Sequence, residues 1–243
     1  MIEYDNVWKS FGDNRVLKGI SLDVREGETF FVLGQTGAGK TVMVRLLVGL
    51  LHADSGAVRI DGEDITGFSE QDFQRIRKKC GMVFQLPTLF DSMTVFENIA
   101  FGLRRLGNLS EEEIGERVKN TLEDVELDFS ICLRLPHELS FGEQKRVGLA
   151  RTVILSPRYV LYDEPTTGLD PFTADRINDL VLRLNRKMGA TAIVVSHDLL
   201  SMNKIADRVG LLYKGEFRFV GPVKDFNRSD DPVVAEFRGG GEA

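Results

Sequence analysis

The chain has 243 residues, of which 42% are hydrophobic and 28% charged, and this suits one sizeable globular domain with its own core. The net charge of −6 argues against a broad nucleic-acid-binding surface, and the two distant cysteines, Cys80 and Cys132, predict reduced thiols in a cytoplasmic protein. Apolar runs stay well below the roughly 18 residues of a membrane-spanning helix, and the N-terminal residues lack the pattern of a secretory signal, so we expect neither.

Strand-like and helix-like segments alternate along the chain, which favours an α/β fold. Residues 2–8 and 17–24 are expected to pair as antiparallel strands around a turn at 12–14. Residues 28–33 form a short apolar strand that leads through glycines into a helix at 40–51. Further buried strands are expected at 159–162, 191–195 and 208–213.

Residues from about 89 to 157 have a different pattern, which predicts a mainly helical subdomain inserted into the α/β domain of residues 1–226. Ser110 and Glu113 form a capping-box pattern at the start of one helix. One apolar stripe follows it, formed by Ile114, Val118, Leu122 and Val125. Residues 227–243 are polar and end in glycines, so we expect a C-terminal extension with frayed ends.

A phosphate-binding loop is predicted between the strand at 28–33 and the helix that follows. The sequence GQTGAGKT fits the pattern G-x-x-x-x-G-K-[ST], and glycines let the backbone amides wrap an anionic phosphate. Lys40 is expected to reach the β- and γ-phosphates, and the Thr41 hydroxyl to ligate Mg²⁺. The loop consists of Gly34, Gln35, Thr36, Gly37, Ala38, Gly39, Lys40 and Thr41.

Two acidic residues end the strand at 159–162, in the sequence YVLYDEP. Taken alone, such a pair is a solvated turn. Together with the phosphate loop, it predicts that Asp163 supports Mg²⁺ and that Glu164 orients the attacking water or accepts its proton.

These motifs together resemble the ATP-binding-cassette (ABC) ATPases over about residues 2–226. The family's signature, usually written LSGGQ, matches LSFGE at 139–143. The resemblance implies a P-loop NTPase cassette with a RecA-like core, an antiparallel β subdomain and a helical subdomain, using ATP and Mg²⁺. Its further motifs match Gln85 in VFQ, Asp170 in GLD and His197 in VVSHD, while Phe11 matches the aromatic residue that stacks on adenine.

The resemblance also implies how these residues share the chemistry. Catalysis falls to Glu164, His197, Gln85 and Lys40. The residues implied to bind Mg²⁺ are Thr41, Gln85 and Asp163. Besides the phosphate loop, nucleotide contacts fall to Phe11, Val42, Ser140, Phe141, Gly142, Glu143 and Asp170. His197 is expected to contact the γ-phosphate.

Three positions depart from the family pattern. Val42 stands where a second Ser or Thr is common, so one hydroxyl contact to the α-phosphate is missing. Phe141 replaces a signature glycine, and we expect its ring to turn aside from the contact glycine, Gly142. Glu143 replaces glutamine but keeps the capping box with Ser140, whose oxygen is expected to cap the helix while its proton points outward to a phosphate.

The family resemblance implies two kinds of partner. A second copy pairs head to tail, so that each signature closes over the other subunit's nucleotide. An integral membrane permease, contacted near residues 86–103, holds the pair at the cytoplasmic face of the inner membrane. The apolar residues there, Leu89, Phe90 and Met93, are either ordinary core or part of that contact surface.

The runs LFDSMTVFENIAFGL and DPVVAEF resemble the cassettes of Mla/Mce-type phospholipid transporters. The expected function is therefore ATP hydrolysis that powers lipid transport between bacterial membranes, with an Mce-domain lipid-binding protein as a further partner and no nucleic acid. A cassette for another cargo, such as an amino acid, a drug or another solute, is the alternative. A non-transport ABC ATPase is a third alternative, although the long coiled coil or second cassette of such proteins is not seen here.

Overall fold

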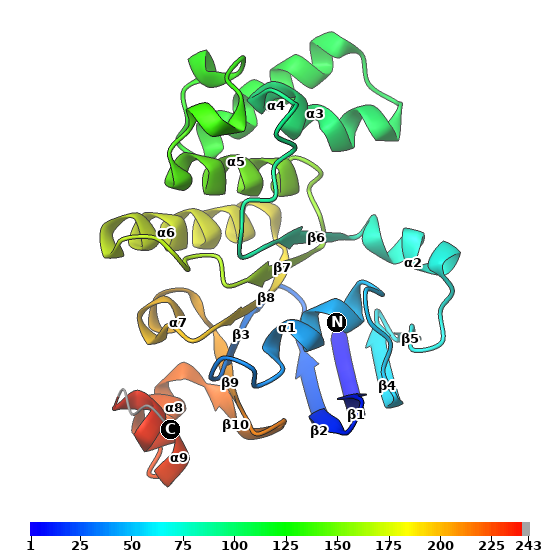
Figure 1. Ribbon diagram of the computed structural model, residues 1–243, viewed down its shortest axis with the longest axis vertical. Helices are drawn as coiled ribbons and strands as arrows, with labels where there is room; N and C mark the ends of the chain where they lie inside the picture. The colour runs from blue at the N-terminus through cyan, green and yellow to red at the C-terminus, as the bar shows by residue number, and fades with distance from the viewer. Residues whose placement is uncertain (240–243) are drawn as a thin grey trace.

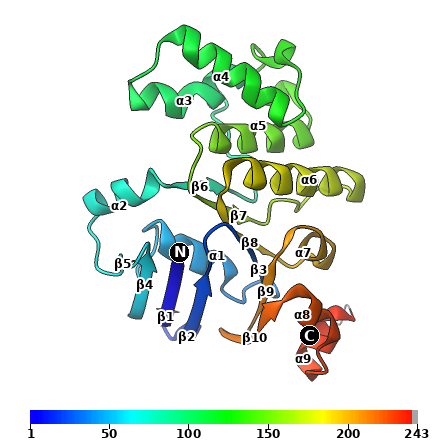
Figure 2. The same ribbon diagram turned by 180° about the vertical axis from the view of Figure 1, so that it is seen from behind.

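The computed structural model describes residues 1–239, which form two β-sheets with helices packed on them (Figure 1). Figure 2 shows the same arrangement from behind, with α3, α4 and α5 at one end and the C-terminal helices at the other. Within residues 1–239, none of the helices combines the length and apolar character that crossing a bilayer requires. Cys80 and Cys132 are free thiols, as expected.

A six-stranded sheet in the order β10-β9-β3-β8-β7-β6 forms the centre. All its strands are parallel except β10, which pairs antiparallel with β9. The four strands predicted for this region are confirmed to within a residue. The strands are β3 (Thr29–Leu33), β6 (Cys80–Val83), β7 (Tyr159–Asp163), β8 (Thr191–Ser196), β9 (Arg208–Tyr213) and β10 (Glu216–Pro222).

A four-stranded antiparallel sheet in the order β2-β1-β4-β5 forms the second layer. The predicted hairpin is confirmed, with strands longer than the sequence indicated and Gly12 at positive φ in its turn. The strands are β1 (Ile2–Phe11), β2 (Asn14–Val24), β4 (Ser55–Ile60) and β5 (Glu63–Asp64).

The predicted helical subdomain consists of α3 (Val95–Leu106), α4 (Glu111–Asp124) and α5 (Phe141–Val153), which pack on one another. Figure 1 shows it at the end of the molecule opposite the C-terminus. The Ser110 capping box forms, and the predicted stripe of α4 is buried. The remaining helices are α1 (Lys40–Leu47), α2 (Glu70–Arg77), α6 (Pro171–Met188), α7 (Leu199–Ile205), α8 (Val223–Arg228) and α9 (Pro232–Arg238), with 3₁₀ turns η1 (Phe129–Ile131) and η2 (Pro136–Glu138).

Both faces of the central sheet are buried. Successive side chains of a strand point to opposite faces, so alternate residues of one strand enter two different cores. In β3, Phe31 and Leu33 belong to the core shared with helices α3 to α7. Phe30 and Val32 belong to the core shared with α1 and the second sheet. The carboxyl ends of β3, β7 and β8 therefore meet at one edge of a rigid sheet, which is where a parallel sheet places its ligands.

Two sequence predictions are wrong in part. The helix expected at 40–51 ends at Leu47, because Gly49 adopts φ +67 and a side chain there would meet the ring of Phe73 at 2.4 Å. The expected appendage at 227–243 includes α9, which is capped by Asp231 and buries Val234 in the main core. The last part of that prediction, residues 240–243, lies outside the described residues.

Candidate active site

The phosphate loop has the shape that only its glycines allow. A Cβ on Gly34 would lie 2.6 Å from the carbonyl oxygen of Leu212, and one on Gly39 would lie 2.8 Å from a methyl group of Leu17. Gly37 and Gly39 have φ values of +82° and +106°. Gly39 is also the N-cap of α1, and no side chain within residues 1–239 caps that end by a hydrogen bond. Backbone amides at a positive helix end are thus left for an anion, so the loop fits the phosphates of ATP.

Lys40 lies inside this loop. Its Nζ donates to the carbonyl oxygens of Gly34 at 2.6 Å and Gln35 at 3.0 Å, and lies 3.4 Å from Oε1 of Glu164. Burial lowers the pKa of the Lys40 ammonium, while the charge of Glu164 raises it in part. The loop therefore holds its cation close to the groups expected to carry out the chemistry.

Thr41 and Asp163 meet across the sheet edge. The Thr41 hydroxyl donates to Oδ1 of Asp163 at 2.9 Å, although the two residues are far apart in sequence. Burial raises the pKa of Asp163, against the opposing effects of Thr41 and Arg45. Within residues 1–239, no group of three or more His, Cys, Asp and Glu is arranged to hold a metal. A hydroxyl and one carboxylate fit Mg²⁺, which takes its remaining ligands from water and phosphate oxygens.

Glu164 is the residue that directly follows β7. Its φ of +49° is a backbone conformation that is uncommon for a residue other than glycine. Its amide donates to the carbonyl of Val195 at 2.9 Å, which ties the bend to β8. Its Oε2 accepts hydrogen bonds from Ser196 Oγ at 2.9 Å and Thr167 Oγ1 at 3.1 Å. The carboxylate is therefore held in one orientation at the site edge.

The charge state of Glu164 follows from its neighbours. Burial raises the pKa of its carboxyl, but the hydrogen bond with His197 and the charge of Lys40 lower it below its ordinary value overall. Glu164 is therefore a carboxylate at neutral pH. His197 is exposed, and its Nδ1 lies 3.1 Å from Oε2 of Glu164.

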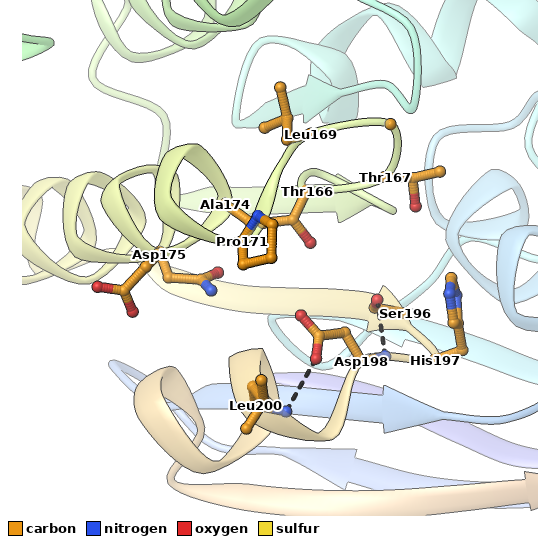
Figure 3. A pocket seen from close by; sticks show the side chains of 12 residues that line it. Thr166, Thr167, Leu169, Pro171, Ala174, Asp175, Ser196, His197, Asp198 and Leu200 are labelled. Carbon is orange, nitrogen blue, oxygen red and sulfur yellow. Dashed lines mark hydrogen bonds between the residues drawn. The ribbon is translucent and has the colours of Figure 1, made fainter. Parts of the chain in front are cut away.

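A cavity of about 360 Å³ lies beside these residues. Its walls come from residues 166–169 after β7, from the first turns of α6, and from residues 196–198 at the end of β8 (Figure 3). In the figure, Ser196 and Asp198 lie across the cavity from Pro171, at the start of α6. Asp170 caps that helix by accepting from the amides of Phe172 at 3.1 Å and Thr173 at 3.0 Å.

The remaining predicted residues lie farther out. Gln85 is exposed in the loop after β6, and its backbone carbonyl accepts a hydrogen bond from Lys145. Phe11 lies at the end of β1, 48% exposed, with the Lys9 ammonium 5.5 Å from its ring centre. Val42 is half-buried in α1.

In the signature, the predicted helix cap is confirmed, but the predicted direction of the Ser140 hydroxyl proton is wrong. Ser140 caps α5 by accepting from the amide of Glu143 at 3.3 Å. The Ser140 hydroxyl, however, donates to Oε2 of Glu143 at 2.7 Å, so its proton does not point outward. The carboxylate takes it because it is the nearest strong acceptor. The ring of Phe141 is turned aside, with its edge 3.3 Å from where a Cβ on Gly168 would lie.

Sequence reasoning missed three residues that contact this site. Thr167 and Ser196 orient Glu164, and Lys145, only 3% exposed, holds the Gln85 carbonyl. Ser196 stands directly before His197, so its position was a usable signal. The burial of Lys145 depends on tertiary packing and left no signal in the sequence.

The family model described as ABC transporter matches residues 17–167 of the chain. The chain is 36% identical over 239 residues to "Probable ribonucleotide transport ATP-binding protein mkl" of Mycobacterium leprae, covering 98% of this chain and 69% of that protein. It is 38% identical over 257 residues to "Protein TRIGALACTOSYLDIACYLGLYCEROL 3, chloroplastic" of Arabidopsis thaliana, covering 99% and 74%. It is 38% identical over 224 residues to "Methionine import ATP-binding protein MetN" of Carboxydothermus hydrogenoformans, covering 92% and 66%.

Two solved structures share the fold. One is the ATP-binding cassette MJ0796, a dimer in a post-hydrolysis state bound to ADP and Pi, with a TM-score of 0.84, 31% identity and coverage of 92% of this chain and 99% of that one. The other is cbiO1 of Clostridium perfringens, part of the ABC transporter complex cbiONQ, with a TM-score of 0.86, 28% identity and coverage of 97% and 93%.

Proposed function

The chain belongs to the ABC transporter family of ATP-hydrolysing cassettes, and we propose that it powers phospholipid transport between bacterial membranes through a separate permease. Cassettes of this family bind ATP with Mg²⁺ and power transport. The lipid cargo rests on one observation, the resemblance of the runs at 89–103 and 231–237 to Mla/Mce-type cassettes. One relative of comparable identity also carries a galactolipid, trigalactosyldiacylglycerol, in its name.

The run at 89–103 supports a permease contact by its surface. Asn98 is fully buried, and its amide nitrogen donates to the carbonyls of Phe90, Met93 and Thr94 at 3.0–3.1 Å. The loop is therefore held in place while Phe90 stays 42% exposed, and Leu86, four residues earlier in the chain, is 65% exposed. Leu89 packs against the core instead. An exposed apolar surface that is held in place suits the docking of a helical segment from a membrane protein.

In the proposed reaction, the chain's residues act in the roles that their positions support. The loop amides and Lys40 bind the phosphates, and Thr41 and Asp163 hold Mg²⁺, with Gln85 reaching it from the loop after β6. Mg²⁺, when bound, neutralises charge on the phosphate oxygens. Glu164 orients the attacking water or accepts its proton, and His197 contacts the γ-phosphate.

A second copy completes each site in this proposal. The dimeric state of MJ0796 supports a pair of cassettes, and the cbiONQ complex supports a transporter assembly. Ser140 and Gly142 of one chain then close over the nucleotide bound to the phosphate loop of the other chain, with Asp170 nearby. Phe11 stacks on the adenine of the nucleotide. The pair works at the cytoplasmic face of the inner membrane, held there by the permease, and an Mce-domain protein receives or delivers the lipid.

Cargo other than lipid is the second candidate, and specific relatives favour it. The names of two relatives of 36% and 38% identity refer to ribonucleotide transport and methionine import. Because the cargo touches the permease rather than the cassette, the ATP site does not separate these candidates.

The test uses the chain purified from membranes together with its permease and reconstituted in phospholipid vesicles. We expect ATP-dependent transfer of a fluorescent phospholipid, absent in the Glu164→Gln variant. Methionine and a ribonucleotide are the matched alternative cargoes. Transport or ATPase stimulation by either of these, without lipid transfer, contradicts the lipid proposal. Co-purification of ribosomal RNA or DNA instead of a multi-span membrane protein contradicts transport itself.

A further inference from the structure

The ring of Phe141 lies on a loop of its own chain. Its Cε1 and Cζ atoms are 3.3 and 3.8 Å from the position that a Cβ on Gly168 would occupy. Gly168 has φ +82 and no side chain, so the ring edge fills the space beside the loop after β7. The next residue, Gly142, is equally close to α6, because a Cβ there would lie 3.1 Å from a methyl group of Thr173. The start of α5 is thus packed against the start of α6.

Lys145 joins this contact to the loop after β6. Its Nζ lies 5.5 Å from the centre of the Phe141 ring and donates to the backbone carbonyl of Gln85. Lys145 is 3% exposed, so its ammonium has little water to replace these partners. A cation held on an aromatic face in a desolvated site is attracted to it more strongly than at the surface. Moving the ring therefore disturbs the contact with Gln85.

The loop that the Phe141 ring touches also contacts Glu164. Thr167, which directly precedes Gly168, donates its hydroxyl to Oε2 of Glu164 at 3.1 Å. The loop that the ring touches is therefore the loop that orients the carboxylate. One continuous set of contacts runs from Gln85 through Lys145, Phe141 and residues 167–168 to Glu164.

We propose that Phe141 and Lys145 are positioning residues that couple the signature helix α5 to Glu164 of the same chain. The proposal rests on the proposed function, in which each signature closes over the partner's nucleotide. Docking of α5 on the partner then presses the Phe141 ring on Gly168 and sets the Thr167 hydroxyl at Glu164. Occupancy of one ATP site thereby activates the other site through these packed contacts.

The kinetic test compares variants in the assembled ATPase. Phe141→Ala is expected to lower kcat about five- to tenfold, to leave the KM for ATP within about twofold, and to bring the Hill coefficient for ATP to about 1. Phe141→Met keeps an apolar side chain of similar length against Gly168 but offers no aromatic face to Lys145, so it is expected to restore only part of the rate. Phe129→Ala removes a comparably exposed ring outside the site and is expected to match wild type.

Lys145→Met removes the ammonium and keeps the aliphatic stem. It is expected to lower kcat as Phe141→Ala does, and the double variant is expected to be no worse than about twofold below either single variant, because both changes break the same contact. Full multiplication of the two effects would show two separate roles and would overturn the coupling.

Amide hydrogen exchange tests the contact without ATP. Phe141→Ala is expected to increase exchange in residues 166–169 at least about threefold, while α4 stays protected as in wild type. Wild-type exchange and kcat in Phe141→Ala would overturn the inference while leaving the proposed function intact. Faster turnover would also overturn it, since the ring would then obstruct closure. A wild-type complex that does not hydrolyse ATP would instead overturn the proposed function.

Discussion

Replacing Glu164 by glutamine removes one charge and changes almost no volume. The amide oxygen of glutamine still accepts from Ser196 and Thr167, which lie 2.9 and 3.1 Å from the carboxylate. The ion pair with Lys40, at 3.4 Å, is lost. Lys40 keeps the carbonyls of Gly34 and Gln35 as acceptors, so we expect the folded state to lose only about 1–2 kcal/mol.

The rate is expected to change far more than the stability. A positioned general base contributes roughly 10²–10⁴-fold, or about 3–5 kcal/mol of barrier. The pKa of Glu164 lies below its ordinary value, so the carboxylate is the major form above pH 4.5. Its titration therefore lowers the rate by less than about twofold between pH 8 and pH 5, and the larger loss comes in more acidic solution.

Phosphate release under saturating ATP and Mg²⁺ measures this effect, and binding of a fluorescent ATP analogue checks that the site is intact. Glu112→Gln is the matched control, because it makes the same chemical change on the exposed surface of α4 and is expected to leave the rate unchanged. A fall of less than about tenfold in Glu164→Gln, with normal nucleotide binding, would refute the role of Glu164 as the base.

Three further substitutions test the signature, the helix after the phosphate loop and the turn after β4. Glu143→Gln removes a negative charge beside the partner's phosphates and should allow ATP-dependent dimerisation at severalfold lower ATP in sedimentation; an unchanged threshold would show that the carboxylate faces away. Val42→Thr should tighten ATP binding by about two- to tenfold in fluorescence titration, and unchanged affinity would remove the missing-hydroxyl explanation. Partial burial raises the pKa of Asp61, but hydrogen bonds from Tyr159 and Lys79 lower it to about 2 overall. Because this pKa is depressed, its stabilisation is present above pH 3.8 and is lost as pH falls towards 2. Asp61→Asn should therefore lower the free energy of unfolding by about 1–2 kcal/mol at pH 7 in urea titration, and a deficit that does not shrink towards pH 3 would contradict this.

The sequence was most informative where chemistry is local. The phosphate loop and the acidic pair after β7 were predicted because glycines, strand patterns and adjacent side chains define them within a few residues. Their meeting at 2.9 Å, between Thr41 and Asp163, follows from parallel strands that end at the same sheet edge.

The sequence was least informative where tertiary contacts decide. The pattern S-x-x-E predicted the cap of α5, but the competition of Glu143 for the Ser140 proton depends on side-chain geometry. The polar composition of the tail predicted fraying, whereas Val234 is buried and α9 is capped by Asp231. An Asp-Pro pair before spaced apolar residues is a helix-start signal that would have indicated this helix.

The most direct test of the central claim mixes two inactive chains. Lys40→Ala removes the loop cation and Ser140→Ala removes the signature hydroxyl. If each ATP site combines the loop of one chain with the signature of the other, a mixed dimer contains one intact site. We predict that mixing equal amounts restores ATPase activity, because half the dimers are mixed and each has one of two sites. The restored activity is about a quarter of wild type if the two sites act independently, and about five- to tenfold less if an occupied second site is needed for activation. A mixture that stays as inactive as either variant alone would contradict the head-to-tail site.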